Sequence, residues 1–107
     1  MSMNRLPYIL IISLKQSIIN KNGKNKLKQM IIYPLYNLEL GDKKYDLYGV
    51  INHIGNFDSI HYNSIIKIKN QWMICDDDKI YNIEEKQVMN KDAYILFYKC
   101  KDSILND

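Results

Sequence analysis

The sequence YDLYGVINH at residues 45–53, followed by IHYNSIIKIK at residues 60–69, decides the fold of this chain. Both stretches are rich in β-branched and aromatic residues, which favour an extended backbone. In a strand, successive side chains point to opposite faces. One face of the second stretch carries Ile60, Tyr62, Ile66 and Ile68, and the other carries His61, Asn63, Lys67 and Lys69. We therefore expect two long strands, with His61 on the more polar face of the second.

A third stretch, WMICD at residues 72–76, brings a carboxylate close to that histidine. Asn70 and Gln71 form a two-residue connection, which is the length that β-hairpins prefer. Paired strands lie about 4.8 Å apart, so His61 and Asp76 are expected to meet. An aspartate in this position accepts the imidazole N–H, fixes the tautomer and stabilises the imidazolium. On spacing alone, a structural hydrogen bond remains the more frequent explanation of such a pair.

The remaining segments complete a small sheet protein. Further extended segments are predicted at YILIISL (8–14), MIIY (30–33, ended by Pro34), KIYNI (79–83) and AYILFYKC (93–100), and a helical turn at EEKQVMN (84–90). NKNGKNK (20–26) is predicted as a solvated turn, and residues 101–107 as a frayed tail. The predicted fold class is α+β, predominantly antiparallel β, in a single domain that spans residues 1–107.

The composition argues against several classes of function. Hydrophobic residues make up 47% and charged residues 25% of the chain, which is typical of a packed globular domain. A net charge of +3 without clustered basic motifs argues against nucleic-acid binding, which leaves a basic RNA-binding β domain as a weaker alternative. The aromatic residues Trp72, Tyr94, Phe97 and Tyr98 are therefore expected in the core rather than stacked on bases. The apolar run at 8–14 is too short to span a membrane, for which about 20 residues are needed.

The two cysteines are expected to be structural. Cys75 and Cys100 offer neither a disulfide framework nor the spacing of metal ligands, so we expect no metal site and an intracellular, reducing location. Strand alternation points Cys75 away from the face of Asp76. We expect Cys75 to be a small buried apolar residue, and Cys100, which ends the last strand, to be structural.

The same segments, taken in order, resemble a known family. YDLYGVINHIG (45–55), IHY (60–62), QWMICDDD (71–78) and DAYILFYK (92–99) resemble the histidine-containing region of the ubiquitin-specific proteases, which are ubiquitin carboxyl-terminal hydrolases. Upstream, LPYILIISLK (6–15) and IIYPLYNLEL (31–40) are similar to two further elements of that family. Matches in one order over residues 6–99 are hard to obtain by chance.

The resemblance implies the sheet-rich half of a papain-like cysteine protease fold and the activity of a cysteine-type deubiquitinase without a cofactor. It implies that His61 is the general base, that Asp76 orients it, and that Asp77 assists near the oxyanion. The nucleophilic cysteine of the family comes from an upstream segment, so this chain alone is expected to be inactive. The implied partners are ubiquitin or ubiquitinated proteins, the upstream half of the catalytic domain, and a second copy paired through exposed strand edges.

One segment departs from the family pattern. Family members have glycines before the histidine, which leave space for the narrow tail of ubiquitin, whereas this chain has Asp58, Ser59 and Ile60 there. We expect these residues and Tyr62 to line the path of the ubiquitin tail, and the branched Ile60 to narrow it. The alternative function is therefore a catalytically inactive module of the same fold that binds ubiquitin or another protein.

Overall fold

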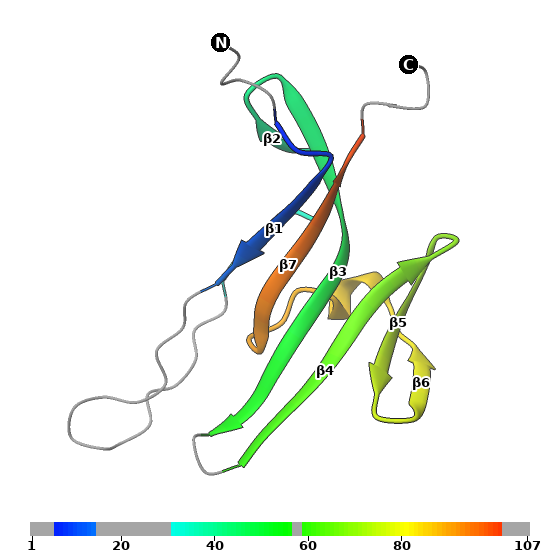
Figure 1. Ribbon diagram of the computed structural model, residues 1–107. Helices are drawn as coiled ribbons and strands as arrows, with labels where there is room; N and C mark the ends of the chain where they lie inside the picture. Colours follow the sequence, from blue (N-terminus) through cyan, green and yellow to red (C-terminus); the bar gives the residue numbers. More distant parts are fainter. Residues whose placement is uncertain (1–5, 15–30, 57–58, 102–107) are drawn as a thin grey trace, which may run out of the picture.

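The computed structural model describes residues 6–14, 31–56 and 59–101, so the predicted turn at 20–26 and the tail beyond Lys101 lie outside the described residues. The described strands form one antiparallel sheet in the order β1-β7-β3-β4-β5-β6, with β2 paired to β3 (Figure 1). The elements are β1 (Ile9–Ser13), β2 (Leu38–Leu40), β3 (Lys43–Asn56), β4 (Ser59–Ile68), β5 (Gln71–Asp76), β6 (Lys79–Asn82), the 3-10 turn η1 (Glu85–Gln87) and β7 (Ala93–Cys100). The predicted class, predominantly antiparallel β with little helix, is confirmed.

Strand β3 organises the sheet because it pairs with three other strands. Its first part pairs with β2 and β7, and its last part pairs with β4. The register with β7 shifts after Leu47 and again after Ile51, as in β-bulges, which bend and twist a strand. Within the described residues, no helix is long and apolar enough to cross a membrane.

The β4–β5 hairpin turns one residue earlier than predicted. Ile68 pairs with Gln71, so the turn residues are Lys69 and Asn70 rather than Asn70 and Gln71. Their φ angles are 49° and 66°. A type I′ hairpin turn requires positive φ at both central positions, and asparagine adopts it readily. Lysine rarely adopts positive φ, so nothing in the sequence indicates that Lys69 belongs to the turn, and the predicted turn position was wrong by one residue.

Residues 31–33 do not form the predicted strand. Tyr33 is buried instead, and its hydroxyl donates a hydrogen bond to the backbone oxygen of Val88 at 2.9 Å. The backbone oxygen of Pro34 accepts a hydrogen bond from the hydroxyl of Tyr98 at 2.7 Å. The segment therefore covers the core with an aromatic side chain rather than pairing in the sheet. The strand that follows it, β2, is absent from the sequence-based prediction.

One face of the sheet carries the hydrophobic core. The buried apolar residues are Tyr33, Tyr45, Leu47, Val50, Ile65, Trp72, Val88, Ala93, Leu96, Tyr98 and Cys100. Val88 follows η1, which lies behind β3 and β4 in Figure 1, and closes the core from that side. Burial, with a smaller effect of nearby Tyr33, raises the pKa of Tyr98 to about 12. The predicted core positions of Trp72 and Tyr98 are confirmed, whereas Tyr94 is 37% exposed.

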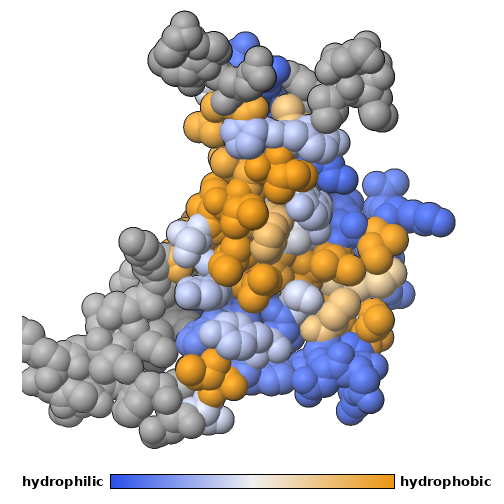
Figure 2. All heavy atoms as spheres, viewed as in Figure 1, coloured by the Kyte–Doolittle hydropathy of each residue, from blue (hydrophilic) through white to orange (hydrophobic). Residues whose placement is uncertain are grey.

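The face of β4 that carries His61 is the more polar one by residue type, but it is also the face that packs on the core. Ile65, which shares that face, is 1% exposed. On the opposite face, Ile60, Tyr62 and Ile68 are 51%, 52% and 44% exposed. Figure 2 shows apolar side chains gathered over β1, β7 and β3 on the face in view, with polar side chains over the β5–β6 turn.

Candidate functional site

His61 and Asp76 meet at the open end of the β4–β5 hairpin. Ser64 pairs with Cys75, so Asn63 and Asp76 occupy the next pair of positions, and His61 lies two residues further along the same face. Nε2 of His61 lies 2.6 Å from Oδ1 of Asp76. The two side chains are 44% and 36% exposed. The structure thus brings together the two residues that the sequence predicts as base and orienting acid.

This hydrogen bond fixes the tautomer of the neutral imidazole. Hydrogen bonds from His61 and then from Asn63 hold the pKa of Asp76 below its ordinary value of 3.8, so the carboxylate is ionised at neutral pH. An ionised carboxylate only accepts hydrogen bonds, so Nε2 of neutral His61 must carry the proton. The other ring nitrogen, Nδ1, then carries the basic lone pair. The pair can therefore act as a general base through Nδ1.

Three asparagine side chains continue from Asp76 toward the core. Asn63 on β4 donates to Oδ2 of Asp76 at 3.3 Å, and Asn52, opposite it on β3, donates to Oδ1 of Asn63 at 2.9 Å. Asn90, which follows η1, donates to Oδ1 of Asn52 at 3.2 Å. Among the described residues, Asn52 is the one buried polar side chain, at 3% exposed. No sequence motif marks these three asparagines as a group, although an asparagine within the apolar run GVINHIG is unusual enough to signal one of them.

Asp77 lies beside the pair, in the turn between β5 and β6. Its φ is 56° and its side chain is exposed. One potential metal-ligand atom from each of His61, Asp76 and Asp77 lies within 4.8 Å of the others. An auxiliary role for Asp77 stays a prediction.

The residues before His61 form the start of β4. Asp58 lies outside the described residues, and Ser59 is exposed and pairs with Asn56. Ile60 pairs with Gly55 and points to the face opposite His61. The side chain of Ile60 therefore does not stand beside the imidazole on its own face. The assignment of these residues to the path of a substrate tail stays a prediction.

Tyr62 belongs to an aromatic group on that opposite face. Its ring centroid lies 5.2 Å from that of His53, which in turn lies 5.5 Å from that of Tyr94. Both ring pairs are tilted, as is usual for aromatic contacts. The second histidine of the chain thus packs between two tyrosines and stands apart from the His61–Asp76 pair.

Neither cysteine lies beside His61. Cys75 points to the opposite face of the sheet and is half-buried rather than buried as predicted. Cys100 is buried and pairs with Tyr45. His61 pairs with Ile54, which is about 30 Å along β3 from Tyr45. The His61–Asp76 pair therefore lies apart from both cysteines of this chain.

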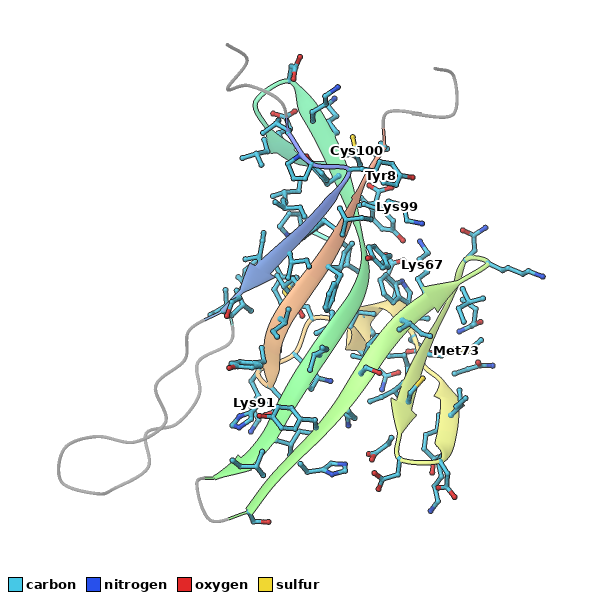
Figure 3. All side chains as sticks on the ribbon, viewed as in Figure 1. Tyr8, Lys67, Met73, Lys91, Lys99 and Cys100 are labelled. Carbon is cyan, nitrogen blue, oxygen red and sulfur yellow. The ribbon has the colours of Figure 1, made fainter. Side chains whose placement is uncertain are left out.

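Two pockets lie at opposite ends of the β4–β5 hairpin. The pocket next to the pair has a volume of about 210 Å³ and is lined by Asp76, Asp77, Asp78, Lys79 and Tyr81. The other has a volume of about 310 Å³ and is lined by Asp46, Leu47, Tyr48, Lys67, Lys69, Asn70, Lys99, Cys100 and Lys101. Figure 3 shows Lys67 on β4 and Lys99 on β7 in that region. Lys67 donates a hydrogen bond to the hydroxyl of Tyr36 at 2.9 Å.

Comparison with known proteins supports one family. The family model described as "Ubiquitin carboxyl-terminal hydrolase" matches residues 1–98. Human "Ubiquitin carboxyl-terminal hydrolase 19" is 33% identical over an alignment that covers 92% of this chain and 9% of that protein. "Probable ubiquitin carboxyl-terminal hydrolase 8" of Schizosaccharomyces pombe is 32% identical, over 97% of this chain and 24% of that protein.

A solved structure is similar to this one in both fold and sequence. It is described as the "SAGA Ubp8/Sgf11/Sus1/Sgf73 DUB module bound to ubiquitin aldehyde". The TM-score is 0.76 at 30% identity, and the match covers 91% of this chain and 25% of that one. This chain therefore spans a quarter or less of the length of these relatives. By family match, sequence identity and fold, the chain belongs to the ubiquitin carboxyl-terminal hydrolase family.

Proposed function

We propose that this chain is the part of a cysteine-type deubiquitinase that supplies the general base and the acid that orients it. The observation that carries this proposal is the 2.6 Å hydrogen bond between Nε2 of His61 and Oδ1 of Asp76. It leaves Nδ1 as the basic nitrogen, in a family whose members are named hydrolases. The nucleophilic thiol comes from a preceding segment of the same catalytic domain.

The reaction follows from these two side chains and one thiol. Nδ1 of His61 takes the proton of the cysteine, which gives a thiolate and an imidazolium stabilised by Asp76. The thiolate attacks the carbonyl carbon at the C-terminus of ubiquitin, and the imidazolium then gives its proton to the departing amine. Water, deprotonated by His61, releases ubiquitin from the thioester. In this proposal, Asp77 assists by holding a polar group near the oxyanion.

The proposed substrate is ubiquitin joined to a protein, and the proposed location is inside the cell. Support comes from the solved relative described as bound to ubiquitin aldehyde. The tail of ubiquitin would approach along the start of β4, past Asp58, Ser59, Ile60 and Tyr62. Ser59, which is exposed at the start of β4, leaves room for such an approach.

The test uses ubiquitin joined to a fluorophore by a C-terminal amide. We expect no hydrolysis by the 107-residue chain, and hydrolysis by a protein that also contains the family's cysteine-bearing upstream segment. His61→Ala should lower kcat/KM of that longer protein by roughly 10²- to 10⁴-fold, the usual contribution of a general base. His53→Ala is the matched control, because the other histidine packs between tyrosines away from the pair.

Two results would decide against this function. Turnover by the 107-residue chain that disappears in Cys75→Ala would make Cys75 the nucleophile. Ubiquitin binding without hydrolysis by the longer protein would instead identify the catalytically inactive module.

A further inference from the structure

The asparagine chain behind Asp76 has a defined direction. Oδ1 of Asn90 accepts a hydrogen bond from the backbone N–H of Asp92 at 2.8 Å, and its Nδ2 donates to the backbone oxygen of Val88 at 3.1 Å. A backbone N–H can only donate and a carbonyl can only accept, so the orientation of the Asn90 amide is fixed. Its Nδ2 therefore also donates to Asn52, and not the reverse.

That direction passes unchanged through the next two amides. Asn52 uses Oδ1 to accept from Asn90 and Nδ2 to donate to Asn63. Asn63 uses Oδ1 to accept from Asn52 and Nδ2 to donate to Oδ2 of Asp76. An ionised carboxylate only accepts, so the far end agrees with the direction set at Asn90. The donors all point toward Asp76.

Stability alone does not call for such a chain. A buried polar group is costly unless it is hydrogen-bonded, and replacing both partners by apolar groups of similar shape is often neutral. Asn52, at 3% exposed, sits where an apolar side chain would complete the core beside Val50 and Ile65. What the amides add is a fixed position for Oδ2 of Asp76, which turns Oδ1 toward His61.

We propose that Asn90, Asn52 and Asn63 are positioning residues that hold the carboxylate of Asp76 with Oδ1 toward Nε2 of His61, and so keep Nδ1 as the basic nitrogen. The consequence of this positioning for catalysis rests on the proposed function. The positioning itself does not depend on it, because the three asparagines, Asp76 and His61 all belong to this chain.

The test measures the imidazole directly, by long-range ¹H–¹⁵N NMR of the labelled 107-residue chain at a pH where His61 is neutral. We expect the Nε2–H tautomer in the unmodified chain. Asn63→Leu keeps a side chain of similar size and removes the hydrogen bonds, so the tautomers should mix. Asn90→Ala, at a position linked to Asp76 only through Asn52 and Asn63 in this hydrogen-bond chain, should shift the tautomer ratio in the same direction. Ser64→Ala, on the opposite face of β4, is the control and should change nothing.

Two outcomes would overturn the proposal. One is an Nδ1–H tautomer in the unmodified chain, a result that needs no variant to fold. The other is an unchanged tautomer in folded Asn63→Leu and folded Asn90→Ala. Dispersion of the backbone amide spectrum reports whether each variant is folded.

A kinetic measurement separates this proposal from the proposed function. In the longer protein, Asn63→Leu should lower kcat about 10-fold, a part of the roughly 10²- to 10⁴-fold that general-base catalysis supplies, and leave KM unchanged. If the tautomer shifts as expected but neither protein hydrolyses ubiquitin amides, the positioning stands and the proposed function fails. If hydrolysis depends on His61 but the tautomer ratio is unchanged in Asn63→Leu and Asn90→Ala, the proposed function stands and the positioning proposal fails.

Discussion

Gly55 on β3 lies so close to Ser59 on β4 that a Cβ atom at position 55 would overlap the backbone oxygen of Ser59. Its φ of 108° also lies in the region that L side chains rarely adopt. We expect Gly55→Ala to lower the free energy of unfolding by about 1–3 kcal/mol, because both the backbone angle and the close approach must change. Urea denaturation of the variant and the unmodified chain would measure the loss.

Gly49 provides the control for that substitution, because it lies on the same strand. A Cβ atom there would lie 3.6 Å from the nearest atom outside its neighbours, Cβ of Phe97. Gly49→Ala should therefore cost clearly less stability than Gly55→Ala. Equal losses in the two variants would show that the contact with Ser59 is not the cause.

Tyr98 should make the fold sensitive to alkali. Its pKa is about 12 in the folded chain against about 10 in an unfolded one. The stabilisation by the neutral phenol is therefore complete below pH 10 and is lost as the pH rises through 12. Tyr98→Phe removes the hydrogen bond to Pro34 and should lower the free energy of unfolding by about 1 kcal/mol at pH 8. The variant should then lose less stability than the unmodified chain between pH 8 and pH 11. Urea unfolding at pH 8 and pH 11 measures this loss of stability. Tyr8→Phe, at an exposed position, is the control. An equally steep loss of stability in Tyr98→Phe and in the unmodified chain would contradict the prediction.

Asp76 should behave in the opposite sense, in acid. Its pKa lies below 3.8 because His61 and Asn63 donate hydrogen bonds to the carboxylate. Its contribution to stability is therefore present above the unfolded pKa of about 3.9 and is lost as the pH falls through the lower folded value. The ¹³C resonance of its carboxyl carbon should titrate with a midpoint below 3.8, and His61→Ala should move that midpoint upward. A midpoint that stays in place in His61→Ala would mean that the imidazole is not the main cause.

The edge strand β1 should promote self-association. It lies at one end of the strand order, and Ile11 is 60% exposed on it. Unpaired strand edges with apolar side chains are templates for pairing with another chain, and a charge on the edge opposes this. We expect Ile11→Lys to lower the average mass in analytical ultracentrifugation at high concentration. Ile80→Lys, on the edge strand β6, is the matched variant; a mass that falls only in that variant would assign the association to β6 instead.

The strands with the strongest β-branched and aromatic patterns could be predicted from the sequence. The boundaries of β3, β4, β5 and β7 lie close to the expected ones, because their side-chain pattern follows the sheet period of two. The segment at 31–33 has the same composition but no strand partner, because Tyr33 is used to cover the core. Composition reports preference for an extended backbone, whereas pairing depends on what lies beside the segment.

The pair of His61 and Asp76 could also be predicted, since both residues lie on one hairpin and the turn limits their separation. The link to Asn90 could not, because it depends on where the chain returns after η1, 38 positions away from Asn52. Nor could the orientation of each amide, which is set by backbone groups at Val88 and Asp92. Such contacts depend on tertiary structure rather than on any local pattern.

The order of the strands also bears on how the protein folds. His61 and Asp76 come from a meander in which β3, β4, β5 and β6 pair with their neighbours in sequence, so short loops are enough to bring them together. The pairing of Ile9 with Lys99, by contrast, joins the two ends of the chain. Long-range pairings of this kind form slowly because loop closure precedes the gain from contact. The His61–Asp76 pair is therefore expected to form before β1 pairs with β7. It should also remain intact when β1 alone unfolds from the sheet.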